Sequence, residues 1–212
     1  MSKRLLDIFL SAIGLVVLAP FLLLIGFLVK GYDNGPVLYR QMRVGEDGLP
    51  FFMLKFRSMI EEADRGSKLT IGRDRRITPM GHLLRKTKLD ELPQLWNVLM
   101  GEMSMVGPRP EVPHYVESYT PEQKVVLELK PGITDPASFA FYNESEILAK
   151  ASDPERFYID QLMPEKIRIN LEYARKASLR TDLLLIFATV AKIFSVRVNI
   201  FSVLKMREPG VR

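Results

Sequence analysis

The sequence predicts an α+β fold that is mainly α-helical, with one small β-hairpin and an N-terminal membrane segment. Three observations lead to this prediction: a long uncharged run near the N-terminus, two short strand-like segments after it, and helix-start signals through most of the remaining chain. The 212 residues are enough for one domain with its own hydrophobic core.

The uncharged run extends from Ile8 to Val29. As a helix it would reach roughly 33 Å, which is close to the thickness of the hydrocarbon core of a bilayer. It is too long for the apolar part of a signal peptide, and no small-residue cleavage site follows it. We therefore expect the segment to remain in the membrane.

The path of this segment depends on Pro20, near its middle. Proline donates no backbone hydrogen bond and clashes with the preceding turn, so we expect a kink or a break there. Basic residues tend to stay on the cytoplasmic side, and they flank both ends of the run: Lys3, Arg4, Lys30, Arg40 and Arg43. These features alone leave two alternatives open, a re-entrant helix broken at Pro20 and a transmembrane anchor with a proline kink.

The hairpin is predicted from two segments, Val37 to Val44 and Phe51 to Met59, with a turn-rich linker, Gly45 to Pro50, between them. Residues 60–76 are highly charged, so we expect an exposed loop or a short helix there.

Helix signals follow. Thr78-Pro79 predicts a helix start, with the helix running to about Leu89, and a second helix is predicted from Pro93 to Gly101. Because proline disfavours helical geometry in the residue before it, we expect Leu92 to separate the two helices. Asp90 and Glu91 would then lie at or just before a helix N-terminus.

Further along, Thr120 to Gln123 resembles a capping box, and Lys130-Pro131-Gly132 ends that helix. After Asp153-Pro154 most of the chain is predicted to be helical, with a break at Met163-Pro164. The run from Leu183 to Ala191 is too short to span a bilayer, so it fits either an interfacial helix or a buried core helix.

The composition excludes several classes of function. The chain has no cysteine, so a disulfide framework, a thiolate metal site and a cysteine nucleophile are all excluded. The two histidines, His82 and His114, make a multi-histidine metal site a poor fit. The formal net charge of +5 is a weak indication of an anionic partner.

The sharpest local feature is the adjacent carboxylate pair Asp90 and Glu91. Mg²⁺ is typically held by one or two carboxylates together with substrate phosphates, and arginines bind phosphate through two parallel hydrogen bonds. Basic residues surround the pair in the sequence: Lys55, Arg57, Arg85, Lys86, Lys88 and Arg109. A phosphoryl-transfer site is one interpretation, with a carboxylate as metal ligand or nucleophile. Simple helix capping is the alternative.

Three stretches resemble one known family. Leu89 to Pro110 reads LDELPQLWNVLMGEMSMVGPRP, and LKFRSM (Leu54 to Met59) and KPGIT (Lys130 to Thr134) accompany it in the expected order. With the proline-centred apolar segment, they make the chain similar to the bacterial sugar transferases, the monotopic phosphoglycosyl transferases. The resemblance runs from Lys3 to about Leu204, so we expect a nearly minimal catalytic unit without the extra membrane helices of longer relatives.

The resemblance implies an activity and its partners. Such enzymes move a phosphosugar from a UDP-sugar to polyprenyl (undecaprenyl) phosphate, release UMP and require Mg²⁺. They do so on the cytoplasmic face of the bacterial inner membrane, as the first step of lipid-linked glycan assembly. Anionic membrane lipids are the further expected partner, a homodimer is compatible with the resemblance, and nucleic acid is not expected because the chain has no recognised nucleic-acid module.

The resemblance also assigns roles by position. Asp90 matches the nucleophile that forms a covalent phosphosugar intermediate, and Glu91, with Asp90, matches the Mg²⁺ site. Arg85 matches a phosphate-contacting arginine, and Pro108 and Arg109 fall in the loop that holds the nucleotide. Lys55 and Arg57 match the basic strand that lines the active site, and Pro20 matches the proline that breaks a re-entrant membrane helix.

The implied organisation has three parts. These are a re-entrant helix-break-helix at 1–32, a small cytosolic catalytic core at 33–178, and interfacial amphipathic helices at 179–212. Two departures from the family pattern stand out: Ala19 replaces the usual Ser before the membrane proline, and Asp135 replaces the usual Gly after PGIT. Two rival hypotheses remain, a direct single-step transferase and a membrane-associated scaffold without catalysis.

Overall fold

The computed structural model describes residues 2–60, 63, 69–72, 74–193, 196 and 198–210. Its described part is mostly helical with two small sheets, which confirms the predicted fold class. The N-terminal half contains α1 (Ser2–Asp33), β1 (Leu38–Val44), η1 (Glu46–Gly48), β2 (Pro50–Phe56), α2 (Pro79–Lys86), η3 (Leu89–Glu91), α3 (Gln94–Met100) and β3 (Ser104–Val106). The C-terminal half contains α4 (Pro113–Val116), α5 (Pro121–Lys124), η4 (Val125–Glu128), β4 (Gly132–Thr134), α6 (Pro136–Ala140), α7 (Glu144–Leu148), α8 (Pro154–Phe157), η5 (Tyr158–Leu162), α9 (Met163–Lys176), α10 (Leu179–Ile193) and α11 (Ile200–Val203).

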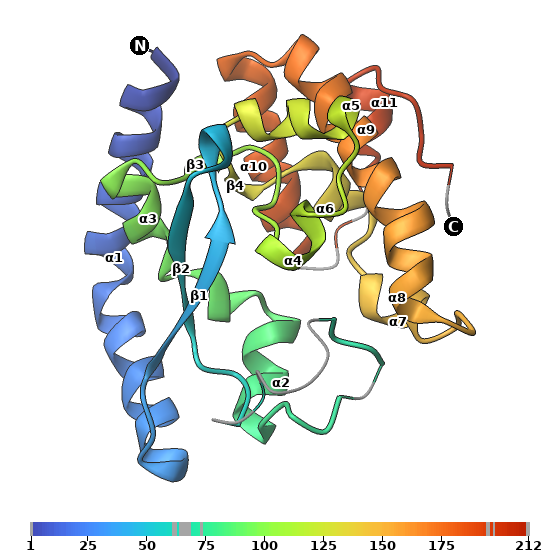
Figure 1. Ribbon diagram of the computed structural model, residues 1–212. Coiled ribbons are helices and arrows are strands. Elements are labelled where there is room, and N and C mark those ends of the chain that lie inside the picture. The colour runs from blue at the N-terminus through green and yellow to red at the C-terminus, as the bar shows by residue number, and fades with distance from the viewer. Residues whose placement is uncertain are drawn as a thin grey trace.

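Helix α1 stands along one edge of the molecule, beside α3 and the hairpin (Figure 1). It continues through Pro20 without an interruption, so the predicted division into two helices differs from the structure. Proline removes one hydrogen bond, but the apolar residues on both sides favour helix strongly enough for the chain to continue. Within the described residues, one helix, Ser2–Tyr32, is long and apolar enough to cross a membrane.

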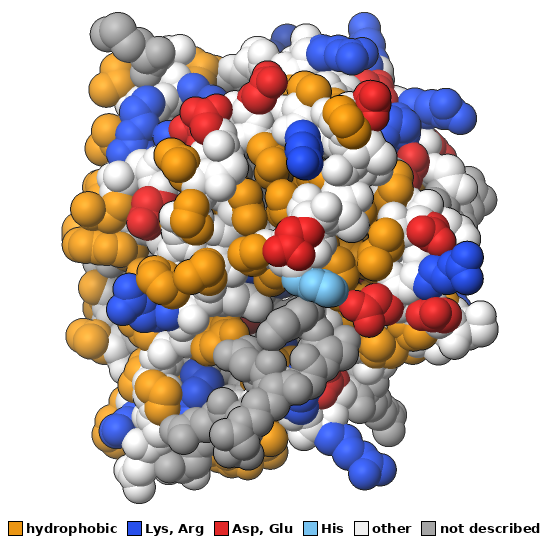
Figure 2. Space-filling view, viewed as in Figure 1, with side chains coloured by type: hydrophobic (Ala, Val, Ile, Leu, Met, Phe, Trp, Pro, Cys, Tyr) orange, Lys and Arg blue, Asp and Glu red, His pale blue; other side chains and the backbone are white. Residues whose placement is uncertain are grey.

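Both ends of α1 are attached to the same folded body. Near its start, Lys3 pairs with Asp182 of α10 at 2.5 Å, and Arg4 donates to the carbonyl oxygen of Val98 at 2.5 Å. Near its end, Ile25 and Val29 are buried in a cluster with Phe56 and Leu84. The outer face of the helix is open and apolar; Val16, Leu23 and Phe27 are each 75% exposed. Figure 2 shows hydrophobic side chains gathered along this edge.

The predicted hairpin is confirmed. β1 and β2 pair antiparallel, with Leu38 opposite Phe56 and Val44 opposite Pro50. The buried side chain of Asn97 ties α3 to this hairpin: its amide donates to the Phe52 carbonyl at 2.9 Å and its oxygen accepts from the Leu54 amide at 3.0 Å. The charged segment predicted at 60–76 falls partly outside the described residues, and its described members Ala63 and Leu69 are buried.

A second sheet was not predicted. β3 and β4 pair in parallel, with Ser104 opposite Gly132 and Val106 opposite Thr134. Each strand has three residues, too few to show a period in the sequence. The buried carboxylate of Asp7 in α1 joins this sheet, accepting from the Ser104 hydroxyl at 3.1 Å and the Met105 amide at 2.9 Å.

The helices from α4 onward pack on the other side of the hairpin around the largest core (Figure 1). The capping box at Thr120 and Gln123 is confirmed, although the α-helix it opens soon tightens into the 3₁₀ turn η4. The predicted break at Met163-Pro164 is wrong. Pro164 lies in the first turn of α9, where no amide donor is needed, and the chain enters that turn through the π-helical η5.

Helix α10 combines the two alternatives considered for its sequence. Leu185 and Ala188 are buried against the core, whereas Phe187 is 69% exposed and Val190 48% exposed. Its role at the membrane interface stays a prediction, as do the three predicted divisions of the chain. Phe194 and Arg197, which follow it, lie outside the described residues.

Candidate functional site

The carboxylate pair lies in a single 3₁₀ turn, η3, between α2 and α3. The chain reverses at Lys88, which adopts a left-handed conformation with φ 58°. This conformation is uncommon for a residue with a side chain. Leu92 is in helical geometry, so the interruption predicted there occurs at Lys88 instead, before η3 rather than after it. The prediction that Asp90 and Glu91 precede a helix is confirmed.

Glu91 is buried and fully engaged by two cations from other parts of the chain. Its Oε1 accepts from Nη2 of Arg109 at 2.6 Å and from Nζ of Lys55 at 3.4 Å. Burial alone would raise the pKa of Glu91, but the charges of Arg109 and Lys55 outweigh it and hold that pKa well below its usual range. Glu91 is therefore a fixed negative charge at the base of the site.

Asp90 differs from its neighbour. It is 5% exposed, and its Oδ1 is buried without a hydrogen-bond partner among the described residues. Burial and the adjacent Glu91 charge raise the pKa of Asp90, against the opposing charges of Lys55 and Arg85. A carboxylate oxygen without a partner is unusual, because an unpaired buried charge is costly.

Lys55 lies on β2 and points at this pair. Burial, with the charge of Arg109, lowers the pKa of Lys55 to about 7, although Glu91 and Asp90 act in the opposite direction. An anion entering beside Lys55 would therefore favour its charged form.

Arg109 is positioned by two backbone segments that approach closely. The Gly107 amide donates to the Thr134 carbonyl at 3.0 Å, and the Gly132 amide donates to the Pro108 carbonyl at 2.9 Å. A Cβ on Gly107 would lie 2.2 Å from a backbone oxygen of Lys130, so the GPRP and PGIT motifs meet where no other residue fits. The charge of Glu91 raises the pKa of Arg109, which keeps the guanidinium protonated.

A cavity of about 570 Å³ opens beside these side chains. Its lining includes Asp90 and the predicted basic residues Lys55, Arg57, Arg85 and Arg109, together with Lys88 and Arg76. Two predicted residues do not line the cavity. Glu91 lies behind Lys55 and Arg109, and Pro108 holds the loop in place by accepting a hydrogen bond from the Gly132 amide. Arg85 also donates to the Thr70 hydroxyl at 2.8 Å. Pro20, in α1, is not part of this site.

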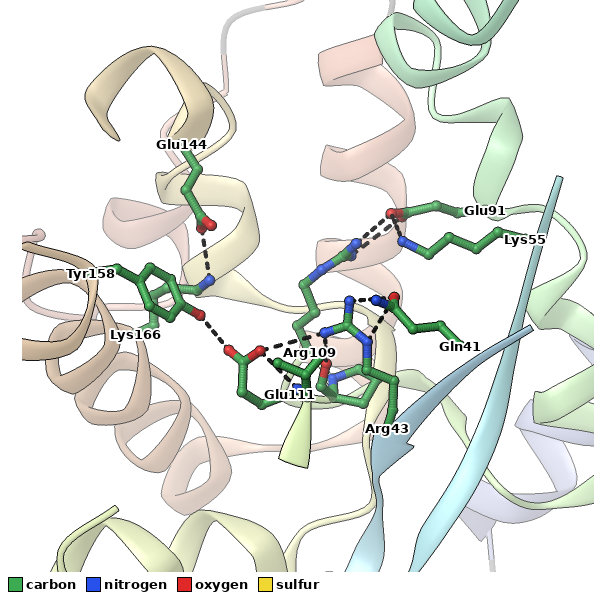
Figure 3. A network of polar contacts seen from close by, with 11 residues as sticks. Gln41, Arg43, Lys55, Glu91, Arg109, Glu111, Glu144, Tyr158 and Lys166 are labelled. Atoms are coloured by element: carbon green, nitrogen blue, oxygen red, sulfur yellow. Dashed lines mark hydrogen bonds and ion pairs between the residues drawn. The ribbon is translucent and has the colours of Figure 1, made fainter. Parts of the chain in front are cut away.

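Sequence analysis missed a second group of polar residues in the same cavity. Tyr158 donates a short hydrogen bond to Glu111, and Lys166 pairs with Glu144 at 2.7 Å (Figure 3). These residues come from a loop, η5, α9 and α7. No local motif connects these residues in the sequence. Only the position of Glu111, directly after the GPRP motif, could have indicated that it lies in the cavity.

The donor set fits Mg²⁺ in part. Among the described residues no group of three or more acidic or histidine side chains surrounds one point. Mg²⁺ needs only one or two carboxylates when phosphate and water supply the other ligands. The unpartnered Oδ1 of Asp90 matches that requirement, whereas both oxygens of Glu91 already accept from Arg109 or Lys55.

Fold and cavity together define a class of protein: a small α+β body with an apolar N-terminal helix and a basic cavity around buried carboxylates, suited to phosphate-bearing ligands. The model of the bacterial sugar transferase family matches residues 1–196, and the chain belongs to that family.

Several characterised proteins are similar to this chain. It is 41% identical over 198 residues to the UDP-glucose:undecaprenyl-phosphate glucose-1-phosphate transferase of Klebsiella pneumoniae. The matched segment covers 91% of this chain and 40% of the relative. It is 33% identical over 205 residues to the exopolysaccharide production protein ExoY of Sinorhizobium fredii, covering 89% of this chain and 84% of that protein. It is 32% identical to an Aeromonas hydrophila UDP-N-acetylgalactosamine-undecaprenyl-phosphate N-acetylgalactosaminephosphotransferase. That match covers 91% of this chain and 44% of the relative. The chain thus spans about 40% of the length of the glucose-1-phosphate transferase.

Proposed function

We propose that this protein is a membrane-associated phosphoglycosyl transferase. It moves a phosphosugar from a UDP-sugar to undecaprenyl phosphate and yields undecaprenyl-diphosphate-sugar and UMP. The names of the similar proteins support the donor and acceptor classes, with glucose and N-acetylgalactosamine among the sugars. The product is the start of a lipid-linked glycan.

Asp90 is the proposed nucleophile. An oxygen of its carboxylate attacks the phosphorus bonded to the sugar, and the bond between that phosphorus and the bridging oxygen breaks, so UMP leaves with the electron pair. A phosphate oxygen of undecaprenyl phosphate then attacks the same phosphorus, and the acyl phosphate bond breaks to restore the carboxylate. The unpartnered, buried oxygen of Asp90 is the observation that carries this assignment.

The cations around Asp90 neutralise the donor. Lys55, Arg85 and Arg109 line the cavity beside the carboxylate, where developing phosphate charge would otherwise be costly. Asp90 and Glu91 are the residues that would hold Mg²⁺, which supplies further neutralisation of the diphosphate when bound.

The attachment of α1 supports a helix that does not cross the membrane. Lys3 and Arg4 at one end, and Ile25 and Val29 at the other, contact the same folded body. If α1 spanned the bilayer, one set of these contacts would have to break. We therefore propose that the protein is monotopic, on the cytoplasmic face of the bacterial inner membrane, with the apolar outer face of α1 in the lipid.

The test of the activity is a screen of UDP-sugars for UMP release in the presence of undecaprenyl phosphate and Mg²⁺. Release with one or more sugars, dependent on the lipid for turnover, is the expected result. The rival of another class, a scaffold of the same fold, predicts no UMP release from any donor and an Asp90→Asn variant that retains its cellular function.

A further inference from the structure

The cavity has two chemically different walls. The wall around Asp90 carries an excess of positive charge from Lys55, Arg57, Arg76, Arg85, Lys88 and Arg109. The second wall carries two carboxylates, each paired with a cation that also lines the cavity: Glu111 with Arg43, and Glu144 with Lys166. Phosphate suits the first wall, whereas the ion pairs of the second wall leave it without an excess of positive charge.

The residues of the second wall form one connected set (Figure 3). Lys166 pairs with Glu144 at 2.7 Å and lies over the Tyr158 ring, 5.3 Å from its centroid. Tyr158 donates its hydroxyl to Glu111, and Glu111 also accepts from Arg43 at 3.5 Å. Each of these side chains is held by a neighbour, so the wall presents a fixed pattern of donors and acceptors.

Aromatic surface adjoins this pattern. Tyr115 and Tyr158 are almost completely buried, and their ring centroids are 4.9 Å apart. Both rings line the cavity, as does Phe141. Carboxylates and the Lys166 amine next to aromatic side chains suit an uncharged, polyhydroxylated ring, because hydroxyls bond to the charged groups and C–H groups contact the aromatic atoms that line the cavity.

The two walls are joined by one short segment of the chain. Arg109 of the first wall and Glu111 of the second are separated by Pro110 alone, and both line the cavity. Arg109 reaches the Asp90 side through Glu91, whereas Glu111 reaches Tyr158 on the other side. A group bonded to a phosphate at Arg109 would therefore have the second wall within the same cavity.

We infer that the second wall, Glu111, Tyr158, Glu144 and Lys166, is the sugar-recognition subsite and determines which UDP-sugar is accepted. This inference rests on the proposed function. The nucleotide binds in other parts of the cavity, and these four side chains recognise the hydroxyl groups of the hexose.

The test uses two variants of the full chain. Tyr158→Phe removes one hydroxyl, and Glu144→Gln/Lys166→Met removes both charges of the ion pair together, which avoids an unpaired buried charge. The matched control is Lys176→Met, on the same helix but outside the cavity, where Lys176 pairs with Glu172 at 2.9 Å.

The measurement is kcat/KM for UMP release with UDP-glucose, UDP-galactose and their two N-acetylated counterparts, with the inhibition constant of UMP beside it. We expect the ratio of kcat/KM between the best and second donor to change ~10-fold or more in both variants. The inhibition constant of UMP should change less than about twofold, and the control should match the wild type.

Three results would overturn the inference. A uniform fall for all donors would mean that the wall is only structural, and a large change in the UMP constant would mean that it holds the nucleotide. If neither variant folds, the binding of the four UDP-sugars and of UMP to the wild type decides: equal affinity for all five removes any sugar subsite. Failure of the proposed function has a different signature, the absence of UMP release by the wild type with every donor.

Discussion

The two walls of the cavity use carboxylates in opposite ways. On one wall Asp90 keeps an oxygen without a partner, although Glu91 beside it is saturated by Arg109 and Lys55. On the other wall Glu111 and Glu144 each have a cation or a hydroxyl. A carboxylate with hydrogen-bond or ion-pair partners is fixed in position and can recognise a ligand. A carboxylate oxygen without a partner remains able to form a new bond. One wall of the cavity is therefore suited to bond formation and the other to ligand recognition.

Replacing the reactive carboxylate of Asp90 should have the largest effect. Asp90→Asn keeps the shape but not the charge, and we expect UMP release to fall at least ~10³-fold, as for the loss of a nucleophile. Single-turnover kinetics with saturating donor measure this. Asp160→Asn, an exposed carboxylate paired with Arg156 at 3.3 Å, is the control and should match the wild type.

Glu91→Gln should be the next largest change. The amide leaves the charges of Arg109 and Lys55 without their counter-charge, so we expect turnover to fall ~10²-fold. The Mg²⁺ concentration for half-maximal activity should also rise, and excess chelator should abolish activity of the wild type. Glu102→Gln, whose carboxylate accepts from Asn97 at 2.7 Å, is the matched control. An unchanged Mg²⁺ dependence in Glu91→Gln would contradict its role as a ligand.

Gly132→Ala should disturb both walls together, because the loop from Gly107 to Glu111 carries a residue of each. The added Cβ would lie 2.1 Å from the Gly107 nitrogen, so the two backbones must separate. We expect a loss of about 1–3 kcal/mol in the free energy of unfolding, measured by denaturant titration. Gly31→Ala, where a Cβ meets nothing within 4 Å, should leave stability nearly unchanged.

The smallest effect is expected from Tyr158→Phe. Only the hydrogen bond to Glu111 is lost, so kcat/KM should fall about 10-fold with the preferred donor and change little with the second donor. The change in donor preference, rather than the size of the fall, distinguishes this wall from the Asp90 wall. A fall as large as that of Asp90→Asn would remove the distinction.

The membrane topology of α1 tests whether both of its ends stay attached to the folded body. If α1 does not cross the bilayer, cysteines introduced at Ser2 and at Tyr32 should both react with an impermeant reagent only from the cytoplasmic side. Reaction of the Ser2 position from the outer side would show that the contacts of Lys3 and Arg4 with the folded body are broken in the membrane.

The sequence predicts the parts that depend on local rules. The hairpin follows from a turn between apolar segments, the capping box from Thr120 and Gln123, and the placement of Asp90 and Glu91 from the motif around them. The second wall could not be predicted, because Glu111, Glu144 and Lys166 are brought together only by long-range packing. The left-handed turn at Lys88 and the three-residue strands β3 and β4 likewise depend on tertiary contacts rather than on propensity.

The central claim is that Asp90 forms a bond to phosphorus, and trapping that bond tests it most directly. The protein is incubated with Mg²⁺ and a UDP-sugar carrying label on the sugar, without undecaprenyl phosphate, and the digested chain is analysed by mass spectrometry. We predict one equivalent of UMP and a phosphosugar on the peptide that contains Asp90, with the label released when undecaprenyl phosphate is added. UMP formation only after the lipid is added, with no labelled peptide at any time, would contradict the account and favour direct transfer.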